Sequence, residues 1–405
     1  MIIIRAFTTE EIQRAVKEIF TSRLGKGLPI QKKAKIFIKI NANSDMIGLT
    51  GNTTDLRLIT AVVNFLKHRG YQNIVLGDGT SSGFLNAGID TLKRLSIYKL
   101  GEVLGIKIID LNKAESKPVT LLHNYQLKIA KICFESDYFI NLSKLKTHGE
   151  TQMSGCLKNL IGCVVGLNKQ IVHRDLAGNI LELNRIIEPD LQIIDAVLPM
   201  EGLGPSRGIP KKVGLILADK DPLLLDLACS RIMGRRIKEI PYLALAEKKK
   251  MVGQKLLDEL KKIKVEKYQQ IFSYPNPNFF QRLINHPFYR LFFVKVRYAP
   301  AFFRFFSSGI VAKPMYWFGL RQDYFDKVNA KIEKIEIQTL RVELKQLNNF
   351  CPMSLDVVRD LNSKKCIHCL YCYFADKTGS LKLKGELGHL KYQVQKYKRI
   401  IEEVL

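Results

Sequence analysis

The sequence predicts an α/β protein with a mostly parallel sheet covered by helices, a basic aromatic insertion and a small ferredoxin-like C-terminal segment. Short apolar runs alternate with helical stretches up to about residue 265 of the 405-residue chain. The next segment combines aromatic and basic residues, and a later one holds closely spaced cysteines. We therefore predict an α/β domain (1–265), an aromatic-rich module (266–325), a degenerate ferredoxin-like cluster segment (326–390) and a C-terminal helix (391–405).

The first elements of the α/β domain have recognisable ends. Thr8 and Glu11 have the spacing of a capping box, and apolar residues then recur at helical spacing over 8–25. A strand at 34–40, a helix from about Asp55 to Gly70 and a strand at 73–76 together predict a βαβ unit. Further strands are predicted at 106–109, 138–141, 192–197 and 213–217, and a further helix at 221–234.

Composition narrows the class of protein. A hydrophobic content of 46% with 25% charged residues describes a globular protein and argues against wholesale disorder. The formal charge of +26 predicts attraction to polyanions, and eight sparse cysteines fit a reducing compartment better than a disulfide scaffold. We find no pattern of a signal peptide or membrane-spanning helix, so the sequence predicts a cytoplasmic protein.

The strongest chemical signal is a group of cysteines near the C-terminus. Cys366, Cys369 and Cys372 are each separated by two residues, and Cys351 precedes a proline. A loop with this spacing can wrap three corners of a cubane cluster while a remote cysteine closes the fourth. We therefore predict that Cys351, Cys366, Cys369 and Cys372 hold one 4Fe-4S cluster. Zinc and unligated thiols are the alternatives, although structural zinc sites usually pair two C-x2-C knuckles.

The cysteine pattern resembles a bacterial two-cluster ferredoxin domain, in which each run gives its last cysteine to the other cluster. In that register Arg341, Leu344 and Leu347 stand where the cysteines of the first run would be. Asp376 stands at the last position of the second run. One cluster is therefore expected to be lost and one kept, which leaves electron transfer, sensing and a structural role open.

A glycine-rich turn and a basic stretch are candidate anion sites. The turn at 77–83 follows a predicted strand and could cradle an anion with its amides, although an ordinary strand-to-helix turn fits equally well. Lys144, Lys146 and His148 follow the apolar run at 138–141, and Lys158-Asn159 comes soon after. Strand ends are where α/β sheets place their ligands, so these residues predict a basic pocket. The alternative is a solvated basic loop.

Carboxylates follow two later strands. Asp195 and Glu201 flank a predicted turn, where they could bind a metal or act as acid and base. Asp219, Asp221 and Asp226 come after the next strand, but Asp221 is followed by proline and could equally begin a helix. For all of these acids a structural role is the simpler interpretation.

Together these motifs resemble the family named domain of unknown function 362. The resemblance covers about residues 35–240 and the cysteine region. Many members of that family carry a ferredoxin-like segment and are described as iron-sulfur cluster-binding proteins. The resemblance implies that one site contains the residues of its two most specific motifs, as candidate catalytic groups: Lys144, Lys146, His148, Lys158 and Asn159. It assigns no reaction to them.

Residues 269–321 differ from the rest of the chain. They contain seven Lys or Arg residues, no Asp or Glu, and 16 of the chain's 37 aromatic residues. Such a segment could lie on an anionic membrane surface, where rings are buried at the headgroup boundary and arginines meet lipid. Packing on the body or across a dimer interface is the second interpretation, and single-stranded nucleic acid is the third.

These predictions combine into a first hypothesis and two alternatives. The first is a cytoplasmic, membrane-peripheral redox protein, a candidate oxidoreductase, whose cluster exchanges electrons with a partner that the sequence does not identify. Its basic pocket would bind an anionic small molecule or a lipid-linked substrate. The second is a non-redox enzyme in which the cluster only stabilises the structure of the C-terminal segment. The third, a nucleic-acid-binding module, rests mainly on charge, so nucleic acid is the least expected partner.

Overall fold

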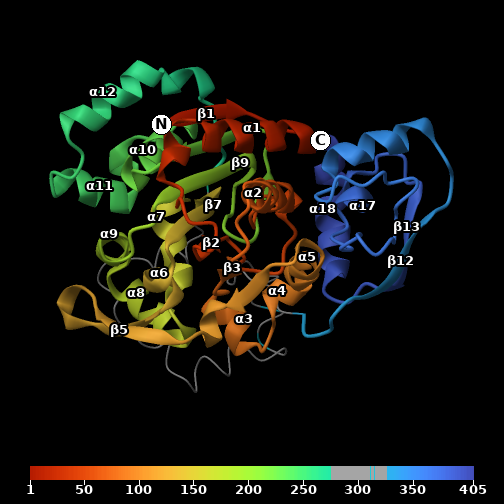
Figure 1. Cartoon of the computed structure of the whole chain (residues 1–405), viewed down its shortest axis with the longest axis horizontal. Helices are drawn as coiled ribbons and strands as arrows, with labels where there is room; N and C mark the ends of the chain where they lie inside the picture. The colour runs from red at the N-terminus through yellow and green to blue at the C-terminus, as the bar shows by residue number, and fades with distance from the viewer. Residues whose placement is uncertain (275–310, 312–313, 315–325) are drawn as a thin grey trace.

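A mixed β-sheet forms the centre of the molecule in the computed structural model, which describes residues 1–274, 311, 314 and 326–405. The sheet has nine strands, in the order β1-β11-β9-β7-β2-β3-β4, with β8 beside β7 and β10 beside β9 (Figure 1). Its strands are β1 (Ile2–Arg5), β2 (Ile36–Lys39), β3 (Ile74–Asp78), β4 (Lys107–Asp110), β7 (Tyr138–His148), β8 (Gln152–Ser154), β9 (Leu191–Glu201), β10 (Ile209–Pro210) and β11 (Leu215–Asp219).

The five strands β9, β7, β2, β3 and β4 run parallel, which confirms the predicted α/β class. One edge of the sheet is antiparallel, because β11, the strand predicted at 213–217, pairs antiparallel with β9 and β1 pairs antiparallel with β11. A separate hairpin, β5 (Ser116–Thr120) with β6 (Gln126–Ala130), was not predicted. Its strands are short, and only β6 has buried residues, which the exposed Lys128 interrupts, so neither strand shows the continuous apolar run of a fully buried strand.

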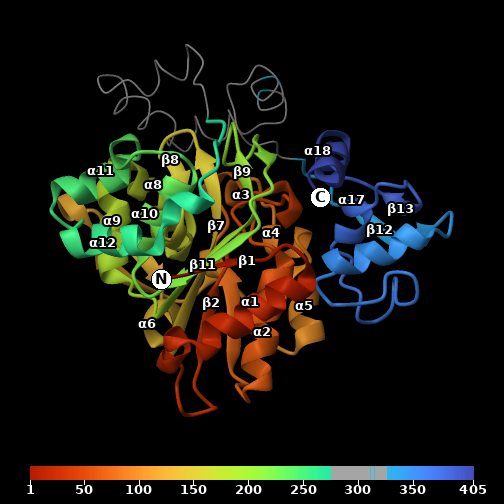
Figure 2. The ribbon, with the colours of Figure 1, turned by 90° about the horizontal axis from the view of Figure 1, so that it is seen from above.

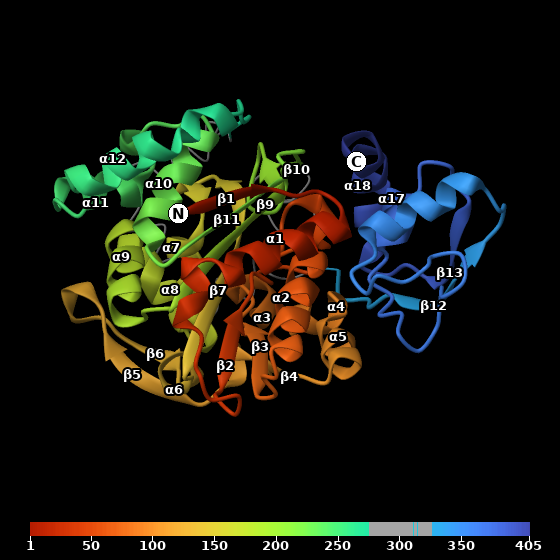
Figure 3. The same cartoon turned by 45° about the horizontal axis from the view of Figure 1, so that its top comes forward.

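Helices cover both faces of the sheet, and the sheet divides the core into two clusters of buried residues. One cluster of buried apolar residues includes α1, α2 and α5, and the other includes α7 and α9 to α11 (Figure 3). The helices are α1 (Thr9–Thr21), α2 (Leu56–His68), α3 (Ser82–Asn86), α4 (Thr91–Arg94), α5 (Ile97–Leu104), α6 (Ile132–Glu135), α7 (Cys156–Asn159), α8 (Lys169–Val172), α9 (Leu176–Ile186), α10 (Pro222–Ile232), α11 (Pro241–Lys248) and α12 (Gln254–Ile263).

The predicted capping residues begin three of these helices. Thr8 accepts the backbone N–H of Glu11, whose carboxylate in turn accepts the N–H of Thr8, so the capping box is present. Asp55 caps α2, and Asp221 caps α10 with proline in its first turn. Helix α1 ends at Thr21 rather than near residue 25, because Ser22 is extended and a 3-10 turn, Arg23–Gly27, follows.

The two longest strands extend further than predicted. The run predicted at 138–141 continues to His148, so Lys144, Lys146 and His148 lie on β7 and not in a solvated loop. The run predicted at 192–197 likewise continues to Glu201, so no turn separates Asp195 from Glu201. Both strands are buried along almost their whole length, as expected for the middle of a parallel sheet covered on both faces.

The C-terminal segment packs beside the α/β domain (Figure 2). It contains a 3-10 helix, Val342–Phe350, the antiparallel pair β12 (Lys331–Ile337) and β13 (Leu381–Glu386), and the helices α17 (Tyr371–Ala375) and α18 (Leu390–Val404). The side chains of Leu344 and Leu347 are buried, so at these positions core packing replaces the ferredoxin cysteines. Asp376 is buried and accepts the N–H groups of Thr378 and Leu381, so it shapes a turn.

Most of the basic aromatic module, namely 275–310, 312–313 and 315–325, lies outside the described residues. Its membrane, packing and nucleic-acid interpretations therefore stay predictions. Within the ranges that the structure describes, no helix combines the length and apolar character needed to cross a membrane.

Candidate functional site

The carboxyl ends of β2 and β3 hold a buried ion pair at the edge where parallel sheets bind ligands. The Lys39 ammonium lies 2.9 Å from the Asp78 carboxylate, and both side chains are almost fully buried. Lys39 also donates to Asn159 Oδ1 at 2.9 Å, and Asn159 donates to Asn141 Oδ1 at 2.7 Å. The predicted residue Asn159 therefore positions a lysine that the sequence analysis missed.

The Asp78 carboxylate also occupies the glycine-rich turn that was a candidate anion cradle. It accepts the backbone N–H groups of Ala42 and Gly79. A Cβ on Gly162 would lie 2.2 Å from Asp78 Oδ1 and 2.6 Å from Lys39 Nζ, so only glycine lets this backbone approach the ion pair. The turn at 77–83 thus holds a carboxylate of the chain itself, which favours its structural interpretation.

Within the described residues, Lys146 donates only to neutral oxygens. Its ammonium donates to Asn41 Oδ1 at 2.9 Å, to Asn43 Oδ1 at 2.7 Å and to the carbonyl oxygen of Asn52 at 2.7 Å. Burial lowers the pKa of Lys146 well below its usual value, and the nearby charge of Lys158 lowers it further. The three oxygens fix the position of the ammonium without neutralising its charge.

Lys169 is a second lysine with neutral partners that the sequence analysis missed. It donates to the carbonyl oxygen of Thr80 at 2.9 Å and to Asn112 Oδ1. Burial lowers the pKa of Lys169 to about 8, and the charge of Lys39 lowers it as well. Lys169 lies on α8, and no local sequence pattern around it indicated that it would join Lys146 in this site.

His148 and Lys158 are the most accessible residues of this group, because both are only half-buried. His148 Nδ1 accepts the N–H groups of Glu150 at 3.1 Å and Thr151 at 3.2 Å, so in the neutral ring Nε2 carries the proton. Burial, with the charge of Lys158, lowers the pKa of His148 well below its usual value. Burial lowers the pKa of Lys158 to about 8, and within the described residues Lys158 forms no hydrogen bond or ion pair.

Lys144, the remaining predicted pocket residue, belongs to a different network. Its ammonium lies 2.9 Å from Asp195 Oδ2, and both side chains are fully buried. Asp195 also accepts the N–H of Asp55 at 2.8 Å, and the Arg57 guanidinium lies 2.6 Å from Asp55. Burial opposes ionisation of Asp55, but Arg57 and Lys144 bring the pKa of this carboxyl below its usual value. This network ties β7 and β9 to the start of α2.

The other predicted acids also have partners within the fold. Glu201 lies 3.1 Å from Lys211, and Asp221 caps α10. Asp226 is buried and accepts the N–H of Cys156 at 2.8 Å and the hydroxyl of Tyr242 at 3.1 Å. Burial raises the pKa of Asp226 to about 6. Asp226 thereby fixes the start of α7, the helix that carries Lys158.

The four C-terminal cysteines line one cavity in the described structure. Backbone N–H groups face their sulfurs, as from Leu355 to Cys351 at 3.4 Å. Burial is the main cause of the raised pKa values of Cys351, Cys369 and Cys372. In the ranges that the structure covers, however, no group of three or more His, Cys, Asp or Glu side chains is arranged to hold a metal ion. The donor set and the surrounding amides nevertheless fit four-cysteine ligation of an iron-sulfur cluster, in which each iron takes one thiolate.

Comparison with known proteins concerns the part of the chain that holds Lys39, Lys146, Lys158 and Lys169, here called the lysine cluster. Residues 36–231 match the model of a family described as domain of unknown function (DUF362). Over these residues, called the DUF362 domain below, the chain is similar to that family. A thylakoid-associated protein from Synechocystis sp. is 35% identical over 129 residues, which cover 30% of this chain and 40% of that protein. The lactate racemase apoprotein from Thermoanaerobacterium thermosaccharolyticum aligns with a TM-score of 0.35 at 14% identity, covering 57% of each chain.

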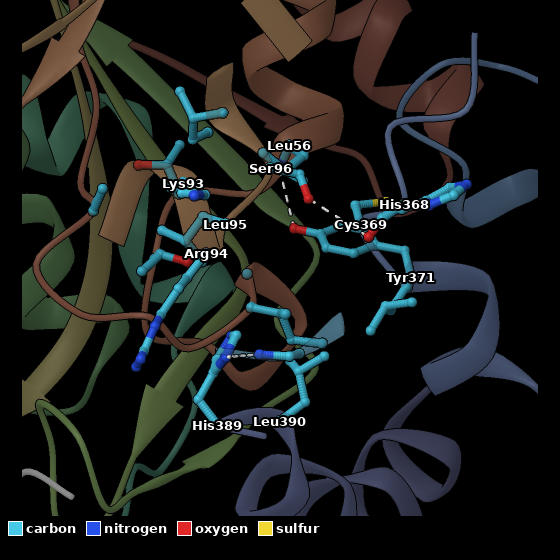
Figure 4. Close-up of a pocket in the computed structure, with 18 of the residues that line it drawn as sticks. Leu56, Lys93, Arg94, Leu95, Ser96, His368, Cys369, Tyr371, His389 and Leu390 are labelled. Carbon is cyan, nitrogen blue, oxygen red and sulfur yellow. Dashed lines mark hydrogen bonds between the residues drawn. The ribbon is translucent and has the colours of Figure 1, made fainter. Parts of the chain in front are cut away.

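A second cavity, of about 210 Å³, is lined by residues of both the DUF362 domain and the C-terminal segment. Figure 4 shows Arg94 and Ser96 on the domain side and Cys369, Tyr371 and His389 on the segment side. Asn41 also lines this cavity, and the same side chain accepts from Lys146. One wall therefore contains a predicted cluster ligand, and the opposite wall contacts the lysine cluster.

Proposed function

We propose that the chain is a redox protein that binds one 4Fe-4S cluster through Cys351, Cys366, Cys369 and Cys372. The observation that carries the proposal is the gathering of these four thiols around one cavity, with backbone amides facing their sulfurs. A 4Fe-4S cluster supplies one-electron chemistry when bound, and hydrogen bonds to the cysteine sulfurs are among the factors that set its reduction potential.

The second half of the proposal is that the lysine cluster binds an anionic substrate. Lys39 is paired with Asp78, whereas Lys146 and Lys169 have only neutral hydrogen-bond partners and Lys158 has none in the described ranges. Buried charges without a counter-charge are costly, and a bound anion would offset that cost. This electrostatic imbalance supports the anionic class of ligand.

The residues of the lysine cluster and its neighbours would have different roles. Lys146 and Lys158 would hold the anionic group, and Asn159 would act through its hydrogen bond to Lys39. His148 is a neutral imidazole with its proton on Nε2, so it could donate a hydrogen bond or a proton to the substrate. Lys144 would keep β7 in place through Asp195 rather than contact the ligand.

Electron paramagnetic resonance of the full-length chain, purified anaerobically and reduced, tests the cluster. We expect a signal in the unaltered chain and its loss in Cys369→Ala. Cys229→Ala is the control, because Cys229 is also a free cysteine but lies in α10. Retention of the signal and of full iron content in Cys369→Ala would contradict the ligand assignment.

A second candidate is a non-redox enzyme acting on an anionic or lipid-linked substrate, with the cluster holding the C-terminal segment in place. The contacts of that segment favour it, since Tyr397 donates to the carbonyl oxygen of Gly208 at 2.9 Å and Gln393 bonds to the backbone of Asp45 and Ile47. Potentiometric titration separates the two candidates. A cluster that never changes oxidation state at accessible potentials supports this second function and contradicts the first.

For location, we infer peripheral association with an anionic membrane surface through 269–321. The composition of that segment supports it, as does the description of the Synechocystis relative as thylakoid-associated. Flotation with anionic liposomes provides the test, with neutral liposomes as the control. Equal binding to both kinds of liposome, or unchanged binding after deletion of 269–321, would contradict the inference.

A further inference from the structure

Lys158 differs from the other members of the lysine cluster because its amine has no partner in the fold. An ammonium group has three N–H donors. Lys39 and Lys146 each donate to three protein oxygens, and Lys169 donates to two. Lys158 forms no hydrogen bond or ion pair within the ranges that the structure describes, and its side chain is half-buried. Among these four lysines, Lys158 therefore has the amine that is free to meet a small molecule.

The backbone on both sides of Lys158 is fixed by buried contacts. Helix α7, which carries Lys158, lies beside β7 (Figure 3). Asp226 accepts the N–H of Leu157 at 3.3 Å, and Asn184 donates to the carbonyl oxygen of Leu157 at 2.7 Å. On the other side, Asn159 is almost fully buried. The fold therefore holds a half-buried amine between two buried residues.

The surroundings favour the neutral form of this amine. Burial lowers the pKa of Lys158 to about 8, and the charge of Lys39 adds to this effect, while the carboxylate of Glu150 opposes it. At pH 7 roughly 10% of such amines are neutral, compared with less than about 0.1% of lysines with an ordinary pKa. A neutral amine is a nucleophile, and desolvation next to another cation is one way in which proteins activate a lysine to react with carbonyl groups.

His148 adds a hydrogen-bond donor near this amine. Among the described residues, Lys158 has the strongest charge effect on the pKa of His148. Two backbone N–H groups face Nδ1 of His148, so its Nε2–H is available to a ligand. A donor in this position stabilises the negative charge that develops on a carbonyl oxygen under attack. The uncompensated charges of Lys146 and Lys169 favour a carbonyl compound that is also an anion.

We propose that Lys158 forms a covalent imine with a small anionic aldehyde or ketone, such as a 2-oxo acid. The lone pair of the neutral amine attacks the carbonyl carbon, a C–N double bond replaces the C–O double bond, and the oxygen leaves as water with both amine hydrogens. This condensation needs no oxidant or reductant. The proposal rests on the proposed anion site and names its substrate class. In its protonated form, Lys158 holds anions that have no carbonyl group.

Reductive trapping of the full-length chain with glyoxylate and cyanoborohydride tests the imine. Glyoxylate is an anionic aldehyde, and reduction of its imine leaves a carboxymethyl group that peptide mass spectrometry locates. Lys17 is the internal reference, because it is exposed on α1 and access alone would favour its reaction. We expect modification of Lys158 at least about tenfold faster than that of Lys17 at pH 7. Modification of Lys158 no faster than that of Lys17 overturns the proposal.

Two comparisons separate the imine from the anion site on which it rests. Glycolaldehyde is an uncharged aldehyde of similar size, so it should prefer Lys158 over Lys17 less strongly than glyoxylate does. Excess sulfate should slow the modification of Lys158 but not that of Lys17. Sulfate binding without preferential modification of Lys158 overturns the imine and leaves the anion site intact. Preferential modification that sulfate does not slow, and that is equal for both aldehydes, contradicts the anion site.

Two variants make the assignment specific. Lys158→Arg preserves the charge but removes the nucleophile, since arginine stays protonated. We expect the fast phase of glyoxylate incorporation to be lost, and its persistence at another lysine overturns the assignment to Lys158. His148→Ala should slow modification of Lys158 at least about tenfold, and an unchanged rate overturns the role of His148. If either variant fails to fold, the comparison with Lys17 in the unaltered chain still decides the proposal.

Discussion

The hydroxyl oxygen of Tyr371 accepts the backbone N–H of Leu56 at 3.1 Å, which joins the cysteine segment to the first turn of α2. Tyr371 lies between Cys369 and Cys372, and Leu56 follows Asp55, the residue bonded to Asp195 on β9. A short chain of contacts therefore runs from the predicted cluster cysteines to the middle of the sheet.

Removal of the Tyr371 hydroxyl should weaken this connection. Tyr371→Phe leaves the Leu56 N–H buried without its acceptor, so we expect a loss of about 1–3 kcal/mol in the free energy of unfolding. Denaturant unfolding measures the change. Tyr373→Phe is the control, because Tyr373 is half-buried and its hydroxyl forms no hydrogen bond in the described ranges. Equal losses in the two variants would refute the role of the Tyr371 bond.

The buried pair of Lys144 and Asp195 should be far more important for stability than an exposed pair. Lys144→Met leaves Asp195 without its partner in a fully buried site, which typically costs about 3–5 kcal/mol. Lys99→Met removes the exposed pair with Glu102 and should cost at most about 1 kcal/mol. Thermal and denaturant unfolding compare the two. A Lys144→Met protein as stable as Lys99→Met would show that the pair contributes little.

Anion binding at the lysine cluster should weaken as pH rises through about 8, the pKa of Lys158 and of Lys169. Sulfate is a suitable probe because its own charge is constant over this range. If one of these lysines must be protonated, the affinity should fall about tenfold between pH 7 and pH 9. Lys158→Met should bind sulfate more weakly and show a flatter pH profile. Affinity that is independent of pH in the unaltered chain would argue against these lysines.

The lowered pKa of Lys158 also makes the free energy of unfolding depend on pH. Between about pH 8 and the ordinary value of 10.5, the unfolded chain binds more protons at Lys158 than the folded chain does. The contribution of this residue to stability therefore rises with pH across that window.

His148 should remain neutral with its proton on Nε2 down to well below pH 6.5. Nitrogen NMR distinguishes a protonated from an unprotonated ring nitrogen, and His148→Gln assigns the signals. We expect an unprotonated Nδ1 throughout the range from pH 6 to 8. A titration near 6.5, with both nitrogens protonated below it, would be inconsistent with the two backbone N–H groups that face Nδ1.

The sequence correctly indicated the helices that begin with a recognisable capping residue. Thr8, Asp55 and Asp221 cap helices because their side-chain oxygens satisfy backbone N–H groups, and that preference depends only on local sequence. The length of β7 was missed, because lysines at alternate positions indicate exposure unless their partners are known. Those partners, Asp195 for Lys144 and Asn41 for Lys146, are distant in the sequence.

The same reason explains the site residues that were missed. Lys39 had a usable signal, since a lysine inside the apolar run at 34–40 must either reach solvent or find a buried partner. Lys169 had none, because only the folded chain brings α8 to Thr80 and Asn112. The cavity lined by His389 also depends on how the C-terminal segment packs against the domain, which no local pattern encodes.

Iron and acid-labile sulfide content of the anaerobically purified full-length chain tests the central claim most directly. Ligation of one 4Fe-4S cluster by the four C-terminal cysteines predicts a brown protein with about four irons and about four sulfides per chain. Colourless, iron-free protein, or protein with one zinc per chain, would contradict it.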